Sequence, residues 1–460
     1  MAWTINNGKL YFNTKLYTGN NSTQSITGVG FQPDWVWVKQ RGGTTNHKTS
    51  DIVRGATKAL QPNDVDAEAT DSNGITAFNS DGFSLGAGGD YNSSSASQVS
   101  WNWLAAGTAP SNTYIVKVVS DGGNKYRFDN FGASAVTLEI SEGGTFTFDQ
   151  SDSSNNGHPL RFSTTSNGTH GGGSEYTTGV TTNGTPGQAG AYTRITVAAS
   201  APTLYYYCTQ HSGMGGQANT PVTNSFSNFA GTIQSNISPN TTSGFSIVSY
   251  TGTGSNATIG HGLGSVPKMI IVKDRDNGSY SWHVYHVGIG NTKTNYLDST
   301  SAPDTGSTYW NNTTPTSSVF SVGSSVTTNK SGDKFIAYCF AEKQGYSKFG
   351  SYTGNGNDGD GPFIYTGFKL AFVIIKKTSA TGNWILLDSK RSNNVNQSKL
   401  FPDTSGAENT DTGNGVDLLS NGFKCRRNNG ETNEGGASYI YMAFAENPFT
   451  SSAGTPVTAR

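Results

Sequence analysis

The stretch from Tyr205 to Gly216, YYYCTQHSGMGG, is the segment whose residue types and spacing together specify a chemistry. Cys208, His211 and Met214 form the pattern C-x-x-H-x-x-M, which places a thiolate, an imidazole and a thioether within seven residues. Such ligands favour copper among the first-row metals. A fourth ligand must come from elsewhere, and His158, in NNGHPLRF fifty residues upstream, is the candidate. The pattern predicts two histidines, a cysteine and a weak axial methionine, the ligand set of type 1 copper.

Two elements must position these ligands. The aromatic run from Thr203 to Cys208 predicts a strand that delivers the cysteine, and a β-sandwich loop can bring His158 over the turn that follows. At these residues the chain resembles the cupredoxin family, over roughly Thr113 to Asn219 and including the Gly-rich approach from Gly184 to Tyr192. The resemblance implies a Greek-key sandwich that binds one copper ion.

One position departs from this resemblance. Many cupredoxins place an asparagine after the first histidine, where it hydrogen-bonds the ligand loop, and here Pro159 takes that position. A contact that orients the ligands and tunes the metal is therefore in question. The alternative interpretation is that Cys208 is a small buried hydrophobic residue in a sandwich that holds no metal.

The composition indicates several β domains. A length of 460 residues suggests three or four domains. Charged residues make up 13% of the chain, against about 25% in average soluble proteins. Short β-branched and aromatic runs alternate with clusters of Gly, Asn, Ser and Asp, and no long amphipathic helix is evident. We therefore predict an all-β fold of tandem β-sandwich domains.

Charge and cysteine content exclude several classes of function. A net charge of −1 without a Lys/Arg cluster argues against nucleic-acid binding. Cys208, Cys339 and Cys425 are too few for a disulfide framework, so reduced, buried thiols are expected. The beginning, MAWTINNGKLYF, has no signal-peptide pattern, and no segment approaches eighteen apolar residues. We expect synthesis in a host cytoplasm and no membrane insertion.

Three segments repeat one plan. Each contains Tyr-Thr-Gly, then an apolar run closed by lysine, then a Phe-centred strand and a final apolar strand, a length of about 95 to 100 residues that suits one β-sandwich. The lysine-closed runs are WVWVK at 35–39, MIIVK at 269–273 and FVIIK at 372–376. The second copy is the most divergent, because it lacks the Ala-Glu motif that the others place after a leucine.

These landmarks divide the chain. The predicted parts are an N-terminal segment (1–16), a first β-sandwich repeat (17–108), the cupredoxin-like domain (112–220), a linker (221–245), a second repeat (246–343), a third repeat (348–450) and a C-terminal tail (451–460). The polar stretches 44–74 and 389–415 are expected to be loops that a rigid scaffold holds out for binding.

The first repeat carries a second resemblance. The phrase LYTGNNSTQSITGVGFQPDWVWVKQR, followed by DIVRGATKAL and VSWNWLAAG, resembles a repeated β-domain of structural proteins of marine phages, closely over residues 17–107 and more loosely in the later copies. The resemblance implies a virion protein, on the tail or capsid surface. The interpretation that follows most directly is a homotrimeric tail fibre or appendage. Such a protein contacts other virion proteins and attaches to a host cell-surface glycan or protein. The alternatives are a capsid-decorating protein and a blue-copper electron-transfer protein.

No motif predicts an enzyme. The sequence lacks G-x-S-x-G, Walker and H-E-x-x-H patterns. Asp388, Glu408 and Asp411 are interpreted as turn and capping residues, and no catalytic site is nominated. The remaining histidines are expected at the surface or in loops: His47, His170, His261, His283 and His286. Four aromatic residues beside polar stretches either stack on sugars or close the rim of a sandwich: Trp282, Tyr285, Trp310 and Trp384.

Overall fold

The computed structural model describes residues 5–391, 398–410 and 415–448. Sheets dominate this part of the chain, which confirms the predicted all-β fold. The α-helices in these ranges are single turns of four residues, Gly89–Asn92 (α1), Ser307–Trp310 (α2) and Val326–Asn329 (α3). Single 3-10 turns lie at Gly8–Leu10 (η1), Ser153–Asn155 (η2) and Gly168–Gly171 (η3). None of the described helices has the length and apolarity needed to cross a membrane.

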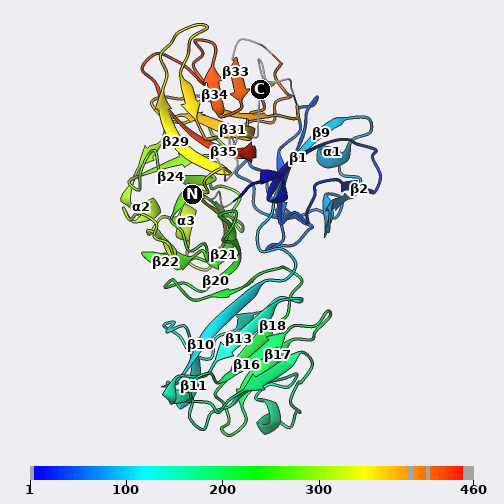
Figure 1. Ribbon diagram of the computed structural model, residues 1–460, viewed down its shortest axis with the longest axis vertical. Helices are drawn as coiled ribbons and strands as arrows, with labels where there is room; N and C mark the ends of the chain where they lie inside the picture. Colours follow the sequence, from blue (N-terminus) through cyan, green and yellow to red (C-terminus); the bar gives the residue numbers. More distant parts are fainter. Residues whose placement is uncertain (1–4, 392–397, 411–414, 449–460) are drawn as a thin grey trace. The chain divides into compact units, whose positions relative to one another are not determined.

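The chain forms two compact units. Unit 1 comprises Met1–Ala105, Pro239–Asn256 and Leu263–Arg460, and unit 2 comprises Ala106–Ser238 and Ala257–Gly262. The lysine-closed runs of all three repeats lie in unit 1, whereas the predicted copper ligands lie in unit 2. Figure 1 shows the strands of both units with their labels.

The first and third repeats have the same two-sheet plan. A four-stranded sheet has the order β1-β9-β3-β4 in the first repeat and β29-β35-β31-β32 in the third. A three-stranded sheet has the orders β2-β8-β7 and β30-β34-β33. The bounds in the first repeat are Phe12–Thr18 (β1), Gln24–Thr27 (β2), Trp35–Gln40 (β3), Lys48–Asp51 (β4), Lys58–Ala59 (β5), Ala69–Thr70 (β6), Ile75–Asn79 (β7), Gly82–Leu85 (β8) and Ser97–Trp103 (β9). Those in the third are Ser347–Thr353 (β29), Phe363–Tyr365 (β30), Phe368–Lys377 (β31), Trp384–Asp388 (β32), Val416–Leu419 (β33), Gly422–Cys425 (β34) and Ser438–Pro448 (β35).

The second repeat keeps the four-stranded sheet and extends it. Its order in unit 1 is β21-β28-β23-β24-β25-β26. The bounds are Phe245–Thr251 (β21), Pro267–Asp274 (β23), His283–His286 (β24), Lys293–Tyr296 (β25), Asp304–Thr305 (β26), Val319–Val322 (β27) and Lys334–Ala341 (β28).

The lysine-closed strands are buried on both faces, which explains their unbroken apolar sequence. In β3, Val36 and Val38 pack into the core between the two sheets of the first repeat. The alternate side chains of the same strand, Trp35 and Trp37, point into a second and larger core. The four-stranded sheet therefore separates two hydrophobic layers.

That larger core belongs to all three repeats at once. Its members include Trp103 of the first repeat, Tyr338 of the second and Phe372 of the third. The rings of Trp35 and Tyr338 stack with centroids 4.3 Å apart, and those of Trp103 and Phe372 meet edge to face at 5.7 Å. The first and third repeats thus each have a core of their own and share a further core with the second repeat.

Equivalent hydrogen bonds join the repeats in a closed ring. His47, Trp282 and Trp384 occupy matching places at the start of the strand after the lysine-closed run, and each reaches a carbonyl oxygen in a neighbouring repeat. The contacts run from the second repeat to the first, from the third to the second and from the first to the third. They are Trp282 Nε1 to Gln61 O at 2.9 Å, Trp384 Nε1 to Tyr296 O at 2.6 Å and His47 Nε2 to Phe401 O at 3.0 Å. A head-to-tail interface that closes on itself gives pseudo-threefold symmetry within one chain.

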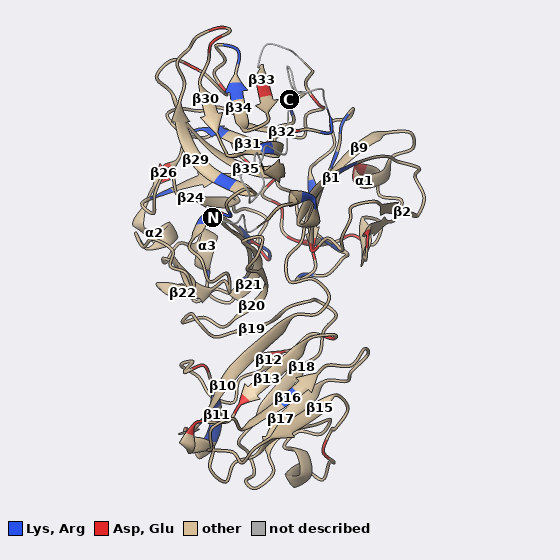
Figure 2. Ribbon diagram, viewed as in Figure 1, with Lys and Arg blue, Asp and Glu red and all other residues tan. Residues whose placement is uncertain are grey.

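Charged side chains reinforce two of these interfaces. Figure 2 shows acidic and basic residues scattered sparsely along the ribbon. Arg275 of the second repeat donates to both carboxylate oxygens of Glu68 in the first repeat, each at 2.8 Å. Arg41 of the first repeat binds Glu408 of the third in the same way, at 2.8 and 2.9 Å. Burial alone would raise the pKa of Glu68, but the hydrogen bonds and charges of its arginine partners lower it below the ordinary value.

Several side chains expected at the surface are in fact buried. The expectation of surface or loop histidines is wrong for His283 and His286, which lie in β24 and are at most 2% exposed. His47 and His261 lie outside the strands, as expected of loop residues, but both are fully buried. Of the two interpretations of the aromatic residues beside polar stretches, stacking on sugars is wrong, because the four side chains are at most 2% exposed: Trp282, Tyr285, Trp310 and Trp384. Their polar neighbours in sequence suggested water, but unit 1 supplies backbone and side-chain partners for polar groups away from solvent.

The stretches predicted as projecting loops also fold inward. Residues 44–74 contain β4, β5 and β6, and Glu68 in this stretch binds the second repeat. In the described part of 389–415, Phe401 and Glu408 bind the first repeat. Asp388 and Glu408, interpreted as turn and capping residues, pair with Arg391, and Asp411 lies outside the described residues.

Unit 2 consists mainly of two sheets. Their strand orders are β11-β10-β13-β16-β15 and β12-β18-β17-β14. A core of aromatic residues includes Tyr114, Phe148 and Tyr206. The stretch predicted as a linker, 221–245, contains β19 and β20. The bounds are Ser111–Ser120 (β10), Asn124–Phe128 (β11), Leu138–Glu139 (β12), Thr145–Asp149 (β13), Leu160–Ser163 (β14), Val180–Asn183 (β15), Tyr192–Thr196 (β16), Leu204–Cys208 (β17), Gly216–Asn219 (β18), Phe226–Asn228 (β19), Ser235–Asn240 (β20) and Ala257–Gly260 (β22).

Candidate metal centre

Strand pairing brings His158 beside Cys208. The aromatic strand β17 ends at Cys208 and pairs antiparallel with β14, in a register that places Leu160 opposite Cys208. His158 precedes Leu160 by two residues, so it lies at the same end of the sheet as the cysteine. The amide of Thr209 donates to Pro159 O at 3.1 Å and fastens the two ligand segments together.

Three of the four predicted ligands converge. Cys208 Sγ lies 3.8 Å from His158 Nδ1 and 3.8 Å from His211 Nδ1, and the donor atoms all lie within 4.8 Å of one another. Bonds of about 2.3 Å to sulfur and about 2.0 Å to nitrogen, at angles between tetrahedral and trigonal, place a sulfur and a nitrogen donor roughly 3.5 to 3.7 Å apart. The two described separations between Cys208 Sγ and the imidazole nitrogens are close to those around a single bound ion.

Met214 lies on the same loop, six residues after Cys208 and two before β18. Its side chain is 1% exposed, and its carbonyl oxygen accepts a hydrogen bond from the amide of Tyr126 at 3.0 Å. A buried thioether in this loop fits the role of a weak axial ligand.

The three donor residues of the site differ in burial. Cys208 is fully buried, His158 is half-buried and His211 is exposed. Burial, together with the charge that His211 carries when protonated, lowers the pKa of His158 below its ordinary value. A lower pKa keeps more of this imidazole neutral near pH 7, which is the form that binds a metal.

Two supporting residues were not predicted from the sequence. The hydroxyl of Tyr126 and the amide Nε2 of Gln150 both donate to His158 O at 2.9 Å. Gln150 is 1% exposed, and its Oε1 accepts from the amide of Leu160 at 3.2 Å. Neither residue lies in a recognisable sequence motif. Tyr126 is in β11 and Gln150 directly follows β13, and each reaches the backbone of His158 from there. Such contacts fix the direction from which the imidazole approaches a metal.

The donor set suits copper or zinc. Thiolate with imidazole is common to both ions, and a thioether as a further ligand favours copper. A copper ion bound there would supply one-electron redox chemistry. His158, Cys208 and His211 would hold it.

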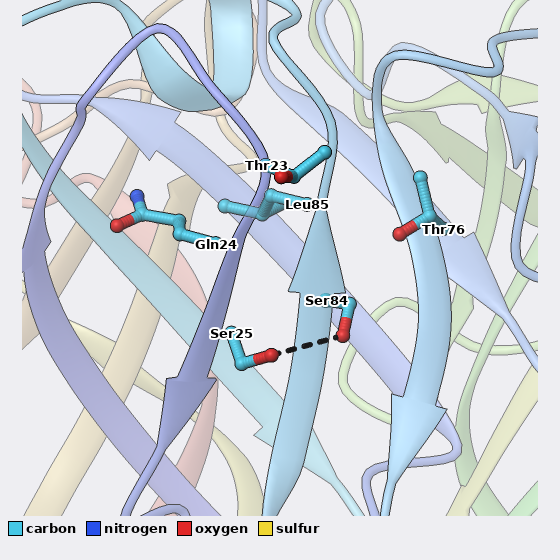
Figure 3. Close-up of a pocket in the computed structure, with 6 residues that line it drawn as sticks. All are labelled: Thr23, Gln24, Ser25, Thr76, Ser84 and Leu85. Carbon is cyan, nitrogen blue, oxygen red and sulfur yellow. Dashed lines mark hydrogen bonds between the residues drawn. The ribbon is translucent and has the colours of Figure 1, made fainter.

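The first repeat has a polar hollow on its surface. The hollow has a volume of about 320 Å³, lies on the three-stranded sheet and is lined by Thr23, Gln24, Ser25, Thr76, Ser84 and Leu85. Figure 3 shows these six side chains. Ser25 Oγ and Ser84 Oγ lie 3.3 Å apart across it. None of these six residues is an acid, a base or a strong metal ligand, so the hollow offers hydroxyl and amide groups for hydrogen bonds but no reactive group.

The fold and the gathered donors define an all-β protein with a candidate thiolate and imidazole metal centre. The chain belongs to the family described as a domain of unknown function (DUF7483), which matches residues 7–124 and 160–448. No curated protein and no solved structure matches it. Cys208, His211 and Met214 lie within the matched residues, whereas His158 lies in the interval between them.

Proposed function

We propose that unit 2 binds one copper ion through His158, Cys208 and His211, with Met214 as the weak axial ligand. The observation that carries the proposal is the pair of 3.8 Å separations between Cys208 Sγ and the two imidazole nitrogens. The test is titration of the metal-free protein with Cu²⁺ under anaerobic conditions. One equivalent should bind and produce a thiolate-to-copper charge-transfer band, and a protein that binds no stoichiometric copper would contradict the proposal.

We further propose that the protein is a structural component of a phage virion, in a tail fibre or another appendage. The sequence resemblance over residues 17–107 supports this setting. The closed ring of unit 1 also supports it, because a shared core with cross-repeat ion pairs gives the rigidity that a particle component needs. Capsid decoration is the alternative position in the particle.

Purified phage particles test the virion setting. Mass spectrometry should detect this chain in density-purified particles at a fixed copy number, and imaging of labelled particles should place it on the tail. Detection on the capsid would support decoration instead. Absence from particles that retain their other structural proteins would contradict the virion proposal.

Host attachment needs an exposed recognition surface, and we propose that the three-stranded sheet of the third repeat provides it. Phe363 and Tyr365 on β30 are 46% and 59% exposed. The first repeat has Ser25 and Thr27 at the equivalent places on β2, since Ile26 pairs with Phe83 as Ile364 pairs with Phe423. The fold therefore does not need aromatic rings there, and exposed aromatic residues can stack on sugar faces.

The variant F363S/Y365T transplants the residues of the first repeat onto the third. We expect it to fold normally and to lose binding to host cells and to their surface glycans. The control L10S removes a different side chain of unit 1, which is 52% exposed, and should bind as the native protein does. Equal binding by F363S/Y365T and the native protein would rule out this attachment surface.

Electron transfer is the second candidate function for the copper site. The observation that favours it is the exposure of His211 beside a fully buried Cys208, which gives one ligand access to solvent and to partners. Voltammetry of the copper-loaded protein should show a reversible one-electron couple. Copper that stays in one oxidation state across the biological range would leave a structural role for the ion.

A further inference from the structure

The loop between Cys208 and Met214 is held by hydrogen bonds to a segment that contains none of the predicted ligands. Asn167 Nδ2 donates to Ser212 Oγ at 2.8 Å, and the amide of Gly213 donates to Asn167 Oδ1 at 2.8 Å. Ser212 and Gly213 are the two residues that separate His211 from Met214. One side-chain amide therefore holds the part of the loop that sets the spacing of two predicted ligands.

Asn167 has an unusual local role. Its φ of 61° and ψ of 15° lie in the left-handed region, which asparagine tolerates better than most residues with a side chain. It directly precedes η3, a place where asparagine commonly caps the turn, yet its side chain makes no capping hydrogen bond. Both the donor and the acceptor of its amide instead cross to the ligand loop.

The turn that carries Asn167 is itself seated against the cysteine strand. A Cβ at Gly168 would come within 2.5 Å of the ring of Tyr207, the residue before Cys208, so only glycine allows this close packing. At the other end of the turn, His170 Nε2 lies 3.0 Å from Cys208 O. The turn thus contacts β17 and the ligand loop together.

We propose that Asn167 is a positioning residue that holds the Cys208–Met214 loop in its metal-binding conformation before a metal arrives. The inference rests on the proposed copper function. Its physical basis is that a loop already held in place loses less conformational freedom on binding, and that contacts outside the ligand set commonly change metal affinity by about 10- to 100-fold.

The variant N167G tests the role of the amide, because glycine accepts the left-handed backbone and removes only the side chain. We expect Cu²⁺ affinity, measured by competition with a chelator, to fall about 10- to 100-fold. The charge-transfer band and the electron paramagnetic resonance spectrum should change as well, since the loop then holds His211 less firmly. N167D keeps an oxygen for the amide of Gly213 and should recover part of the affinity.

The matched control is N130G. Asn130 lies in unit 2, is exposed and has a φ of 60°, so this variant makes the same chemical change in the same backbone conformation away from the ligands. Its copper affinity and spectra should match those of the native protein. If N130G weakens copper binding as much as N167G does, the effect belongs to the backbone and the proposal is wrong.

A measurement on the metal-free protein separates this inference from the copper proposal. Hydrogen exchange at the amide of Gly213 should be at least about tenfold faster in N167G than in the native protein and N130G, because its acceptor is gone. If the native protein binds no copper, the proposed function fails. The exchange measurement then still tests whether Asn167 holds the loop. Unchanged exchange in N167G would overturn the proposal. A lower melting temperature with unchanged copper affinity and spectra would also overturn it, because the role would then be structural only.

Discussion

In the proposed copper site, a substitution of Met214 should change the reduction potential of the ion without preventing copper binding. We expect M214L to keep the buried volume and the three strong ligands, so that one equivalent of copper still binds. The reduction potential should rise, because loss of the axial sulfur destabilises Cu²⁺ more than Cu⁺. Voltammetry of the loaded variant checks this shift. An unchanged potential would show that Met214 does not interact with the ion.

His286 gives a pH dependence in unit 1. It is fully buried, its Nδ1 accepts from the amide of Gly288 and its Nε2 lies 3.1 Å from Tyr441 O, and burial lowers its pKa to about 4. The unfolded chain, with a pKa near 6.5, binds this proton first as pH falls. Stability from the neutral imidazole is therefore complete above about pH 6.5 and is lost towards pH 4.

The variant H286Q removes this proton uptake. Between pH 7 and pH 5 the native protein should lose roughly 2 kcal/mol more unfolding free energy than the variant does. Denaturant unfolding at several pH values, followed by tryptophan fluorescence, measures the difference. Parallel curves for the two proteins would show that His286 does not titrate between the folded and unfolded states.

At the residue scale, the sequence was most informative where ligands are close together. Cys208, His211 and Met214 lie in one short stretch, so their spacing could be read from the sequence, and His158 was expected on a β-sandwich loop that reaches over the turn. The structure brings His158, Cys208 and His211 together. The supporting residues Gln150 and Asn167 were missed. Each acts through strand pairing or a turn that brings distant segments together, and nothing in their local sequence marks that contact.

At the scale of elements, the ion pairs between repeats should matter more than pairs at the surface. We expect R275M to lower the unfolding free energy of unit 1 by roughly 2 kcal/mol, because Glu68 is 11% exposed and loses its bidentate partner in the next repeat. The control is K330M, which removes a lysine that is 38% exposed and pairs with Asp333 of the same repeat. Its unfolding midpoint should match that of the native protein.

Equal effects of R275M and K330M in denaturant unfolding would show that the pair between repeats adds no more stability than a surface pair. A loss in R275M that grows at low salt would instead indicate long-range charge effects, because screening acts mainly on exposed groups.

The strands could be predicted from the sequence, but the residues that pack against each face of them could not. The runs WVWVK, MIIVK and FVIIK are strands β3, β23 and β31, as their apolar sequence indicates. Such a run predicts burial on both faces but does not say what covers each face. The core that joins the three repeats therefore had no signal in any single repeat, and neither did the burial of His47, Trp282 and Trp384 at the contacts between them.

At the scale of the whole molecule, the two units should unfold as two cooperative transitions. The shared core couples all three repeats, so unit 1 should lose its structure in one step. The sequence of unit 2, residues 106–238 and 257–262, contains no tryptophan, so tryptophan fluorescence reports unit 1. Calorimetry combined with fluorescence measures both transitions. Three separate fluorescence transitions would show that the repeats are independent domains.

The most direct test of the central claim is anaerobic Cu²⁺ titration of the native protein and of C208S, followed by absorption and electron paramagnetic resonance. We predict one tightly bound copper per native chain and an intense thiolate-to-copper band. C208S should lose that band, while calorimetry still shows the separate unfolding transition of unit 2, in which Cys208 lies. Absence of stoichiometric copper binding, or an identical spectrum for C208S, would contradict the assignment of His158, Cys208 and His211 as a copper site.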